Sequence, residues 1–302
     1  MTDLPFFSII IPTYNRASLI SKAIESVINQ QESNWELIII DDGSTDNTKE
    51  VVEQFDDARI RYIYQENAER SAARNHGIRK ASGKYICFLD SDDYYLPIHL
   101  STFRTEIEKP ESPKKGFYFI DIIFDEGGKQ TTFENPNPEY TNHIEWMIQM
   151  PIGALRTCIH SEIMKNYEFN PIYNISEDTD VWVQIARTHP VIHIPIATLV
   201  VINHDDRSVD RSNVRSFKKN LSVKKSILKR EKSWISPSIK KKVLHDAWFS
   251  LAMSYEQNAQ HLNMGFAIIM AFIYKPSYRW KEKLYMLLKP IPGFQKIRQY
   301  MQ

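Results

Sequence analysis

An uninterrupted apolar run that ends in a cluster of acids constrains this chain most. Residues 85–89 are apolar or aromatic without a break, which is typical of a buried strand. Asp90, Asp92 and Asp93 follow within four residues. Like charges are very costly to bury together, so the chain must leave the core at this point. We therefore expect a buried strand whose carboxyl end opens toward solvent or a cation.

The first hundred residues alternate between strand-like and helix-like segments. Strand-like runs cover the ranges 6–11, 35–40, 60–64 and 85–89, and helical spacing covers the ranges 17–28, 46–55 and 71–81. This alternation predicts an α/β fold with a Rossmann-like, mostly parallel sheet flanked by helices. The second strand ends in Asp41 and Asp42, so two acidic strand ends should face one crevice, which is where open α/β sheets bind ligands.

The acids at residues 90–93 have two interpretations. Carboxylate oxygens suit Mg²⁺ or Mn²⁺, and these ions usually share their coordination with phosphate oxygens, so Asp90 and Asp92 would form the floor of a metal–diphosphate site. The alternative is a solvated acidic turn that caps the next helix. The chain has only nine glycines and carries neither G-x-G-x-x-G nor a Walker A motif. A bound nucleotide would therefore be held by side chains and metal.

A second acidic pair stands at the start of a predicted helix. Apolar residues recur at helical spacing from residue 181 to residue 186, and Ser176 is a good N-cap. Glu177 and Asp178 then lie at a helix N-terminus, where the dipole favours carboxylates. The alternative is that they only cap the helix and balance its charge. The other segments predicted between residues 97 and 202 are a helix (97–107), a hairpin (117–133), a short helix (145–150), a strand (154–159), and a strand pair or one strand broken at Pro195 (191–202).

Charge is divided unevenly along the chain. The net charge is +1, but residues 1–200 hold 18 Lys/Arg against 30 Asp/Glu, and residues 201–302 hold 20 against seven. Helical patterns cover roughly 215–232, 237–259 and 263–274. An amphipathic tail follows, with an apolar stripe at Trp280, Leu284, Leu287, Leu288 and Ile291, flanking Lys281, Lys283 and Lys289, and a break at Pro290–Pro292. Such a tail either packs on the catalytic domain or contacts an anionic membrane surface.

The cysteine count, the N-terminal residues and the length of the apolar runs predict the compartment of the protein. Two cysteines, Cys87 and Cys158, make no disulfide framework, residues 1–7 carry no secretory signal, and the longest apolar run, 264–274, is too short to span a bilayer. We therefore expect a cytoplasmic protein, peripheral on the inner face of the cell membrane. We expect no nucleic acid partner.

Five segments, in order, resemble glycosyltransferase family 2. They are residues 7–16, 36–46 with Asp-Asp-Gly-Ser, 72–77 with Ala-Arg-Asn, 88–93 with a D-x-D motif, and 176–182 with a Glu-Asp motif. The resemblance covers about residues 6–210 and implies inverting enzymes of the GT-A fold. Residues 1–212 would then be the catalytic domain, with a nucleotide-sugar half (1–100) and an acceptor half (101–212). Residues 213–302 would be a helical, basic C-terminal region.

The resemblance also implies roles for individual residues. Asp178 would be the catalytic base, and Glu177 would orient it or the acceptor. Asp92 would bind Mn²⁺ or Mg²⁺, and Asp90 would contact the ribose or a metal-bound water. His204 would be a further contact to metal or diphosphate, with a solvated loop histidine as the alternative. The nucleotide pocket would be lined by Pro12, Thr13, Tyr14, Asn15, Arg16, Asp41, Asp42, and Arg70 or Arg74.

The expected activity is transfer of a sugar from a nucleotide-diphosphate sugar, UDP-linked, to a hydroxyl of a glycan or lipid-linked glycan in cell-surface polysaccharide synthesis. One alternative is a sugar nucleotidyltransferase, which would need a glycine-rich basic loop where this chain has Pro-Thr-Tyr-Asn-Arg at residues 12–16. The other is a non-catalytic sugar-nucleotide-binding module, which would need no base at Asp178. The sequence specifies neither the donor sugar nor the acceptor.

Overall fold

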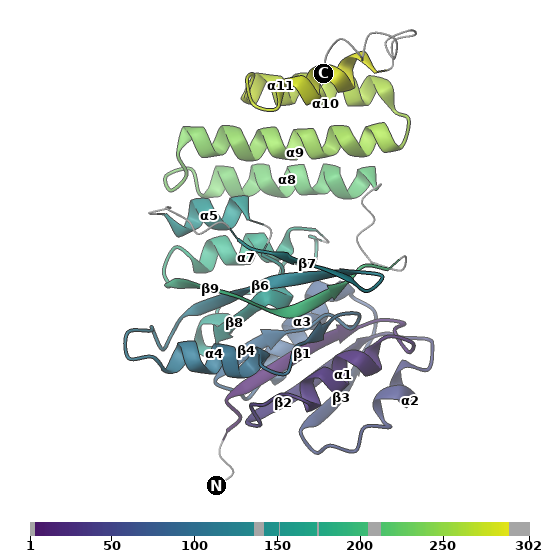
Figure 1. Cartoon of the computed structure of the whole chain (residues 1–302), viewed down its shortest axis with the longest axis vertical. Helices are drawn as coiled ribbons and strands as arrows, with labels where there is room; N and C mark the ends of the chain where they lie inside the picture. Colours follow the sequence, from purple (N-terminus) through teal and green to yellow (C-terminus); the bar gives the residue numbers. More distant parts are fainter. Residues whose placement is uncertain (1–3, 136–141, 151, 174, 205–212, 290–302) are drawn as a thin grey trace. The chain divides into compact units, whose positions relative to one another are not determined.

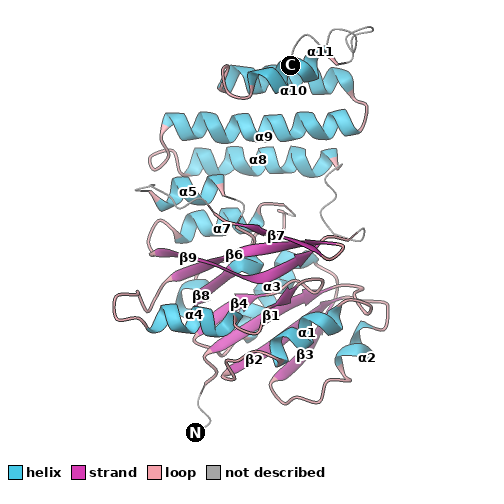
Figure 2. Cartoon of the chain, in the orientation of Figure 1, coloured by secondary structure: helices cyan, strands magenta, loops and turns pink. Residues whose placement is uncertain are grey.

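The chain separates into two compact units, Met1–Asp206 and Arg207–Gln302 (Figure 1). The computed structural model describes residues 4–135, 142–150, 152–173, 175–204 and 213–289. The described part of the first unit contains strands and helices, and that of the second contains helices only (Figure 2).

Four parallel strands form one half of the sheet in the first unit. They are β1 (Phe7–Thr13), β2 (Trp35–Asp42), β3 (Ile60–Gln65) and β4 (Tyr85–Phe88), in the order β3-β2-β1-β4. Thr13 pairs in register with Asp41, and Phe88 pairs with Ile10, so the carboxyl ends of these strands share one edge. The predicted parallel arrangement is confirmed for this half, and it brings both acidic strand ends to that edge.

The other half of the described sheet is mixed. It contains β5 (Tyr94–Tyr95), β6 (Phe117–Glu126), β7 (Lys129–Phe133), β8 (Thr157–His160) and β9 (Val191–Ile202). From β4 the order continues through β8, β6, β9 and β5, and β7 pairs with β6 as the predicted hairpin. Only the β6–β9 pair is parallel in this half. The sheet is therefore parallel on the side of β1 to β4 and mixed beyond it.

Two of the predicted strands differ in detail. The segment predicted as a strand from residue 154 begins as a 3₁₀ turn, Ala154–Arg156, and becomes extended only at Thr157. Residues 191–202 form one strand, and its register against β6 shifts on both sides of Asp121. Pro195 lies in this shift, which is where a residue without an N–H is tolerated in a sheet.

Helices cover the sheet of the first unit. They are α1 (Ile20–Ile28), α2 (Thr48–Val52), α3 (Glu69–Lys80), α4 (His99–Glu108), α5 (His143–Gln149), α6 (Ser161–Met164) and α7 (Glu177–Ile185). The second helix ends at Val52, three residues before the predicted end. The third packs so closely on β1 that a Cβ at Gly77 would lie 2.4 Å from Cγ2 of Ile10. A glycine is therefore required there, and the helix that carries Arg70 and Arg74 is held directly over the sheet.

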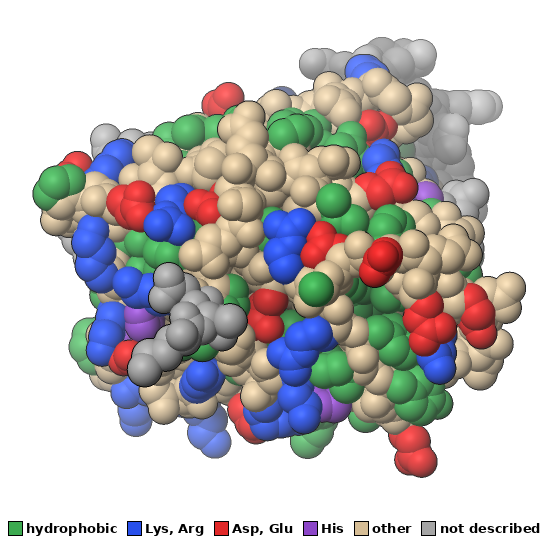
Figure 3. Space-filling view, turned by 90° about the horizontal axis from the view of Figure 1, so that it is seen from below, with side chains coloured by type: hydrophobic (Ala, Val, Ile, Leu, Met, Phe, Trp, Pro, Cys, Tyr) green, Lys and Arg blue, Asp and Glu red, His purple; other side chains and the backbone are tan. Residues whose placement is uncertain are grey.

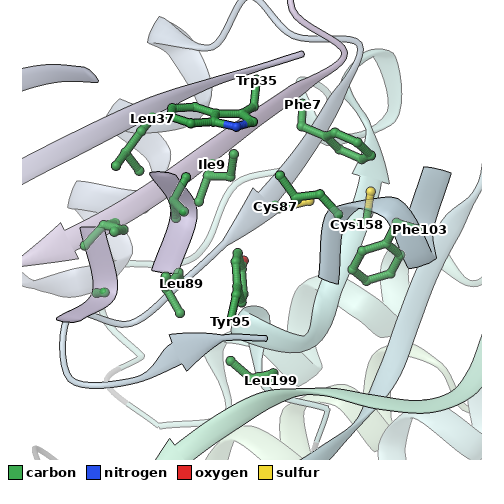
Figure 4. Close-up of a cluster of buried hydrophobic side chains, with 14 of the residues drawn as sticks. Phe7, Ile9, Trp35, Leu37, Cys87, Leu89, Tyr95, Phe103, Cys158 and Leu199 are labelled. Carbon is green, nitrogen blue, oxygen red and sulfur yellow. The ribbon is translucent and has the colours of Figure 1, made fainter. Parts of the chain in front are cut away.

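A continuous apolar core lies beneath the site-bearing strands. Phe7, Leu37, Cys87 and Tyr95, from four different strands, are among its fully or almost fully buried members (Figure 4). Cys87 pairs across β4 and β8 with Cys158, and both thiols are buried and free. This packing anchors the strands whose ends carry the acids.

The second unit contains α8 (Val214–Arg230), α9 (Pro237–Gln257), α10 (His261–Tyr274) and α11 (Trp280–Leu288), close to the predicted ranges. The side chain of Ser236 caps α9, and Pro237 follows at its first position, as helix N-termini favour. Ile291 and Pro290–Pro292 of the predicted tail lie outside the described residues. Among the residues described, no helix combines the length and apolar character needed to cross a bilayer.

Seen from below, the molecule presents acidic, basic and apolar side chains interspersed on one face (Figure 3).

Candidate active site

The loops that follow β1 and β2 are joined by hydrogen bonds. Asn15 has a left-handed φ of 51°, a conformation that asparagine tolerates better than most residues. Its Oδ1 accepts from the backbone N–H of Thr45 at 2.8 Å, and its own N–H donates to Oγ of Ser44 at 2.9 Å. The N–H of Arg16 donates to Oγ1 of Thr48 at 3.0 Å. The predicted nucleotide loop is therefore held in one conformation by the neighbouring loop.

Asp41 and Asp42, at the end of β2, are both nearly fully buried. The hydroxyl of Tyr62 donates to Oδ2 of Asp41 at 2.6 Å, and the N–H of Ser44 donates to Oδ1 at 2.7 Å. Oδ1 of Asp42 accepts from Nε2 of Gln65 at 2.6 Å and also from the backbone at the start of α3. Both carboxylates hold the crevice in shape, and contact between Asp41 and a base stays a prediction.

Two buried polar atoms at this edge have no hydrogen-bond partner among the described residues. They are Oγ1 of Thr13, at the end of β1, and Nε of Arg74, on α3. A buried polar atom without a partner costs free energy, on the order of 1–3 kcal/mol. A ligand that offers oxygens or N–H groups would satisfy them. Pro12 lies within β1, and Tyr14 is half exposed just beyond it.

The acidic turn after β4 contains side chains of two kinds. Asp93 is buried, and its Oδ1 accepts from the backbone N–H of Ile202 at 2.9 Å, which fixes the end of β9 against the turn. Asp90 and Asp92 are partly exposed. The expectation that these acids all leave the core holds for Asp90 and Asp92 and is wrong for Asp93, because a backbone N–H compensates its burial.

The side chains at this turn fit a divalent cation. Carboxylate oxygens of Asp90, Asp92 and Asp93 lie within 4.8 Å of one another. Nε2 of His204, two residues beyond the end of β9, lies 3.0 Å from Oδ2 of Asp92. Oxygen ligands with one imidazole suit Mn²⁺, and the oxygens alone suit Mg²⁺. The structure therefore brings together both residues that the sequence analysis named for the metal.

Arg74 connects this turn to the second acidic pair. Its guanidinium is buried, with Nη2 3.0 Å from Oδ1 of Asp90 and Nη1 2.9 Å from Oε1 of Glu177. Arg70, one turn earlier on α3, places its Nε 3.0 Å from the same oxygen of Glu177. Burial lowers the pKa of Arg74, but Asp90 and Glu177 outweigh this effect, so its pKa is raised. The two arginines, named from the family resemblance for the nucleotide, thus form ion pairs with acids in this structure.

Asp178 follows Glu177 at the start of α7 and is partly buried. Its Oδ1 accepts from the N–H of Thr179 at 2.6 Å. Desolvation and the neighbouring Glu177 raise the pKa of Asp178 to about 6, against the opposing effect of Arg74. The predicted cap is wrong in detail, because Ser176 has a left-handed φ of 58° and its side chain makes no capping bond. A carboxylate with a pKa near neutrality is suited to accept a proton.

Sequence reasoning missed several residues that support this site. Ser44, Thr48 and Tyr62 hold the loops and Asp41 in place, and Asp93 links the acidic turn to β9. Their contacts join residues 21 to 109 positions apart, so no local pattern could reveal them.

Comparison with known proteins identifies the family. Residues 8–160, about half of the chain, match the family model "Glycosyl transferase family 2". The TuaG protein of Bacillus subtilis, named for teichuronic acid biosynthesis, is 42% identical over 186 residues, which are 61% of this chain and 73% of TuaG. The chain belongs to glycosyl transferase family 2.

A second relative is the "GalNAc(5)-diNAcBac-PP-undecaprenol beta-1,3-glucosyltransferase" of Campylobacter jejuni, 32% identical over 191 residues, which are 61% of this chain and 60% of that protein. The chain thus spans less than two thirds of that relative. Among solved structures, the mannosyltransferase PcManGT of Pyrobaculum calidifontis, in complex with GDP-Man and Mn²⁺, is similar with a TM-score of 0.60. It is 17% identical, and the match covers 99% of this chain and 86% of that one. This likeness confirms the predicted GT-A fold.

The raised pKa of Asp178 predicts a pH-dependent effect on stability. An acid whose pKa is higher in the folded state than in the unfolded state costs stability above both pKa values, and the cost disappears as pH falls below them. Asp178→Asn keeps an acceptor for Thr179, and we expect it to raise the free energy of unfolding at pH 7.5 by on the order of 1–3 kcal/mol. Urea denaturation at several pH values measures this, and the gain should shrink as pH falls from about 6 and vanish near about pH 3, below both pKa values. A gain that is independent of pH, or a loss, would contradict the raised pKa.

Proposed function

We propose that this protein is a metal-dependent, inverting glycosyltransferase. It moves a sugar from a nucleotide-diphosphate sugar, UDP-linked as the family resemblance implies, to a hydroxyl of a glycan or lipid-linked glycan. The observation that carries this proposal is the ion-paired path from Asp90 through Arg74 to Glu177, beside a carboxylate of raised pKa at Asp178. Acids that hold a donor and a base that activates an acceptor thus belong to one connected site.

The donor binds at the edge formed by β1, β2 and β4. Oγ1 of Thr13 and Nε of Arg74 supply hydrogen-bonding atoms that the protein leaves unused there. Asp92 and His204 would hold Mn²⁺ or Mg²⁺, with Asp90 close by. When bound, the ion neutralises charge on the leaving diphosphate. The protein holds the donor through oxygens and side chains, as a chain without a glycine-rich phosphate loop requires.

The acceptor approaches from the side of α7. Asp178 takes the proton of the acceptor hydroxyl as its oxygen attacks the anomeric carbon, and a single displacement inverts the configuration there. Glu177 is fixed by both Arg70 and Arg74, so it positions its neighbour. Because the pKa of Asp178 is about 6, this carboxylate is mostly ionised at neutral pH and still basic enough to accept a proton.

The names of two relatives support a proposal for the acceptor class. The Campylobacter relative is named for an undecaprenol-diphosphate-linked acceptor, and TuaG is named for teichuronic acid biosynthesis. We propose that this chain likewise acts on a lipid-linked glycan in cell-surface polysaccharide synthesis. Such an acceptor requires the enzyme to work at a membrane, which favours a peripheral position on its cytoplasmic face.

A panel of sugar nucleotides with release of nucleoside diphosphate as the readout tests the activity. The glycosyltransferase should release the diphosphate and transfer or hydrolyse the sugar. Pyrophosphate formation from a sugar phosphate and a nucleoside triphosphate would instead indicate a sugar nucleotidyltransferase. Donor binding with no turnover on any acceptor, including undecaprenol-linked glycans, would indicate a binding module. The anomeric configuration of the product, read by NMR, tests inversion.

Asp92 is expected to be essential for metal-dependent donor binding. Asp92→Ala removes the carboxylate that contacts His204, so turnover should fall on the order of 10²-fold or more while the fold survives. Calorimetry with UDP, in the presence and absence of Mn²⁺, measures the binding. Asp56→Ala, at an exposed acid before β3, is the matched control and should behave as wild type. Unchanged metal-dependent binding of UDP to Asp92→Ala would disprove the assignment.

Asp178 is expected to control turnover and not donor affinity. Asp178→Asn keeps the shape of the side chain but cannot take a proton, so turnover should fall on the order of 10²–10⁴-fold. Steady-state kinetics and donor binding by calorimetry separate the two effects. Asp180→Asn removes the same charge from the same helix and should retain turnover. If Asp178→Asn turns over normally and Asp180→Asn does not, the base is Asp180.

A further inference from the structure

The helix α10 carries apolar side chains both on its buried side and on its exposed side. One side of the helix is buried and carries Met264, Ala267, Ile268 and Ala271, whose spacing places them on a single face. The helix packs on α9. The opposite side carries an exposed apolar stripe, defined here as Leu262, Phe266, Ile269 and Ile273, with exposed fractions of 93, 59, 52 and 64%. The spacing of four, three and four residues places these side chains on one helical face. Water therefore contacts a row of large apolar side chains about 17 Å long from Leu262 to Ile273, at about 1.5 Å per residue.

No acid interrupts this surface. The 14 residues of α10 include no Asp, Glu, Lys or Arg, and no Asp or Glu occurs in residues 257–281. Singly scattered apolar side chains are normal on a protein surface, but a contiguous stripe marks a surface that something covers. Because α10 carries no charged side chain, its exposed face is not a polar face that water solvates well.

Within residues 275–289, the described part of the C-terminal tail, the helix α11 does not cover the stripe. The sequence predicted that the tail would present its own apolar face with Lys283 on its flank. Instead, Lys283 is buried, and its Nζ donates to the backbone oxygen of Lys275 at 2.6 Å and lies 4.4 Å from the ring centre of Phe272. Met286 is buried as well. The helix α11 thus packs on another side of α10, and the flanking role predicted for Lys283 is wrong.

Aromatic and basic side chains border the stripe. Tyr278 and Trp280 follow the end of α10 and are 43 and 49% exposed. Lys281 is exposed beside them. On another border, the ring of Phe266 packs edge-on against the ring of Trp248. Nζ of the exposed Lys225 lies 4.8 Å from the centre of the Trp248 ring. Residues 213–289 together contain 16 Lys/Arg and four Asp/Glu.

We propose that this stripe is a membrane-binding surface that inserts into the interface of an anionic lipid bilayer. The inference deepens the proposed function, since it rests on a lipid-linked acceptor and names the surface that brings the enzyme to it. An apolar helix face lowers its free energy in the acyl region, and tryptophan and tyrosine prefer the headgroup level. Lys225 and Lys281 meet anionic headgroups, and this charge complementarity selects a membrane over a neutral apolar partner.

Flotation with vesicles tests the surface on the full chain. Vesicles of phosphatidylglycerol with phosphatidylcholine should carry the wild type upward at low salt, and less of it at high salt. Ile269→Glu should lower the partition coefficient at least about tenfold, because it puts a charge in the centre of the stripe. Lys281→Gln should lower it about fivefold. Ile98→Glu is the matched control, since it makes the same change at a 40% exposed isoleucine at the start of α4, where an acid is favoured.

The outcomes separate this inference from the proposed activity. Asp178→Asn should float as the wild type does, because membrane binding needs no catalysis, and a failed donor screen would leave the flotation result standing. Thermal melts confirm that Ile269→Glu is folded. Wild type that stays in the lipid-free fraction, or equal partition of Ile269→Glu and Ile98→Glu, would overturn the inference. A dimer in sedimentation that Ile269→Glu dissociates, with no flotation, would also overturn it and assign the stripe to a second copy of the chain.

Discussion

The buried guanidinium of Arg74 is the contact on which the site depends. It binds Asp90, 16 residues away, and Glu177, 103 residues away, so it ties the donor edge of the sheet to the helix that carries the base. Removing one partner from a buried ion pair leaves an uncompensated charge and costs about 3–5 kcal/mol, although the pair itself adds little net stability. The close packing of α3 on β1 at Gly77 sets the height of this guanidinium over the sheet. The function of the pair is thus to fix geometry, and the backbone packing makes that geometry possible.

The groups that suit this site to catalysis also lower the stability of the folded chain. Asp178 is held next to Glu177 in a partly buried position, which raises its pKa to about 6. Oγ1 of Thr13 and Nε of Arg74 stay without hydrogen bonds among the described residues. Groups of this kind destabilise a folded chain unless a ligand satisfies them, and they are therefore expected at a site that binds a charged donor. Asp41, Asp42 and Asp93 also hold loops in place, and contact of Asp41 or Asp42 with a donor stays a prediction.

Periodicity in the sequence predicted most helices and strands, because apolar spacing depends on local geometry alone. The acidic strand ends and the Glu-Asp pair were also visible, since each adjoins an apolar segment whose period predicts a strand or a helix. The mixed half of the sheet, the links of Asp93 and Arg74, and the inward turn of Lys283 were not predictable, because each depends on a partner far along the chain or on another helix. The left-handed φ at Ser176 was not predictable either, because serine rarely adopts this conformation.

The pH dependence of kcat/KM in Arg74→Gln tests the central role of this arginine most directly. Arg74 lowers the pKa of Asp178, in opposition to burial and Glu177. Without the guanidinium, the acidic side of the pH–rate profile should therefore move to a higher pH than in the wild type. Arg79→Gln, at an exposed arginine on the same helix, should leave the profile unchanged. A profile of Arg74→Gln that coincides with the wild type would show that Arg74 does not act on the base and would contradict this account.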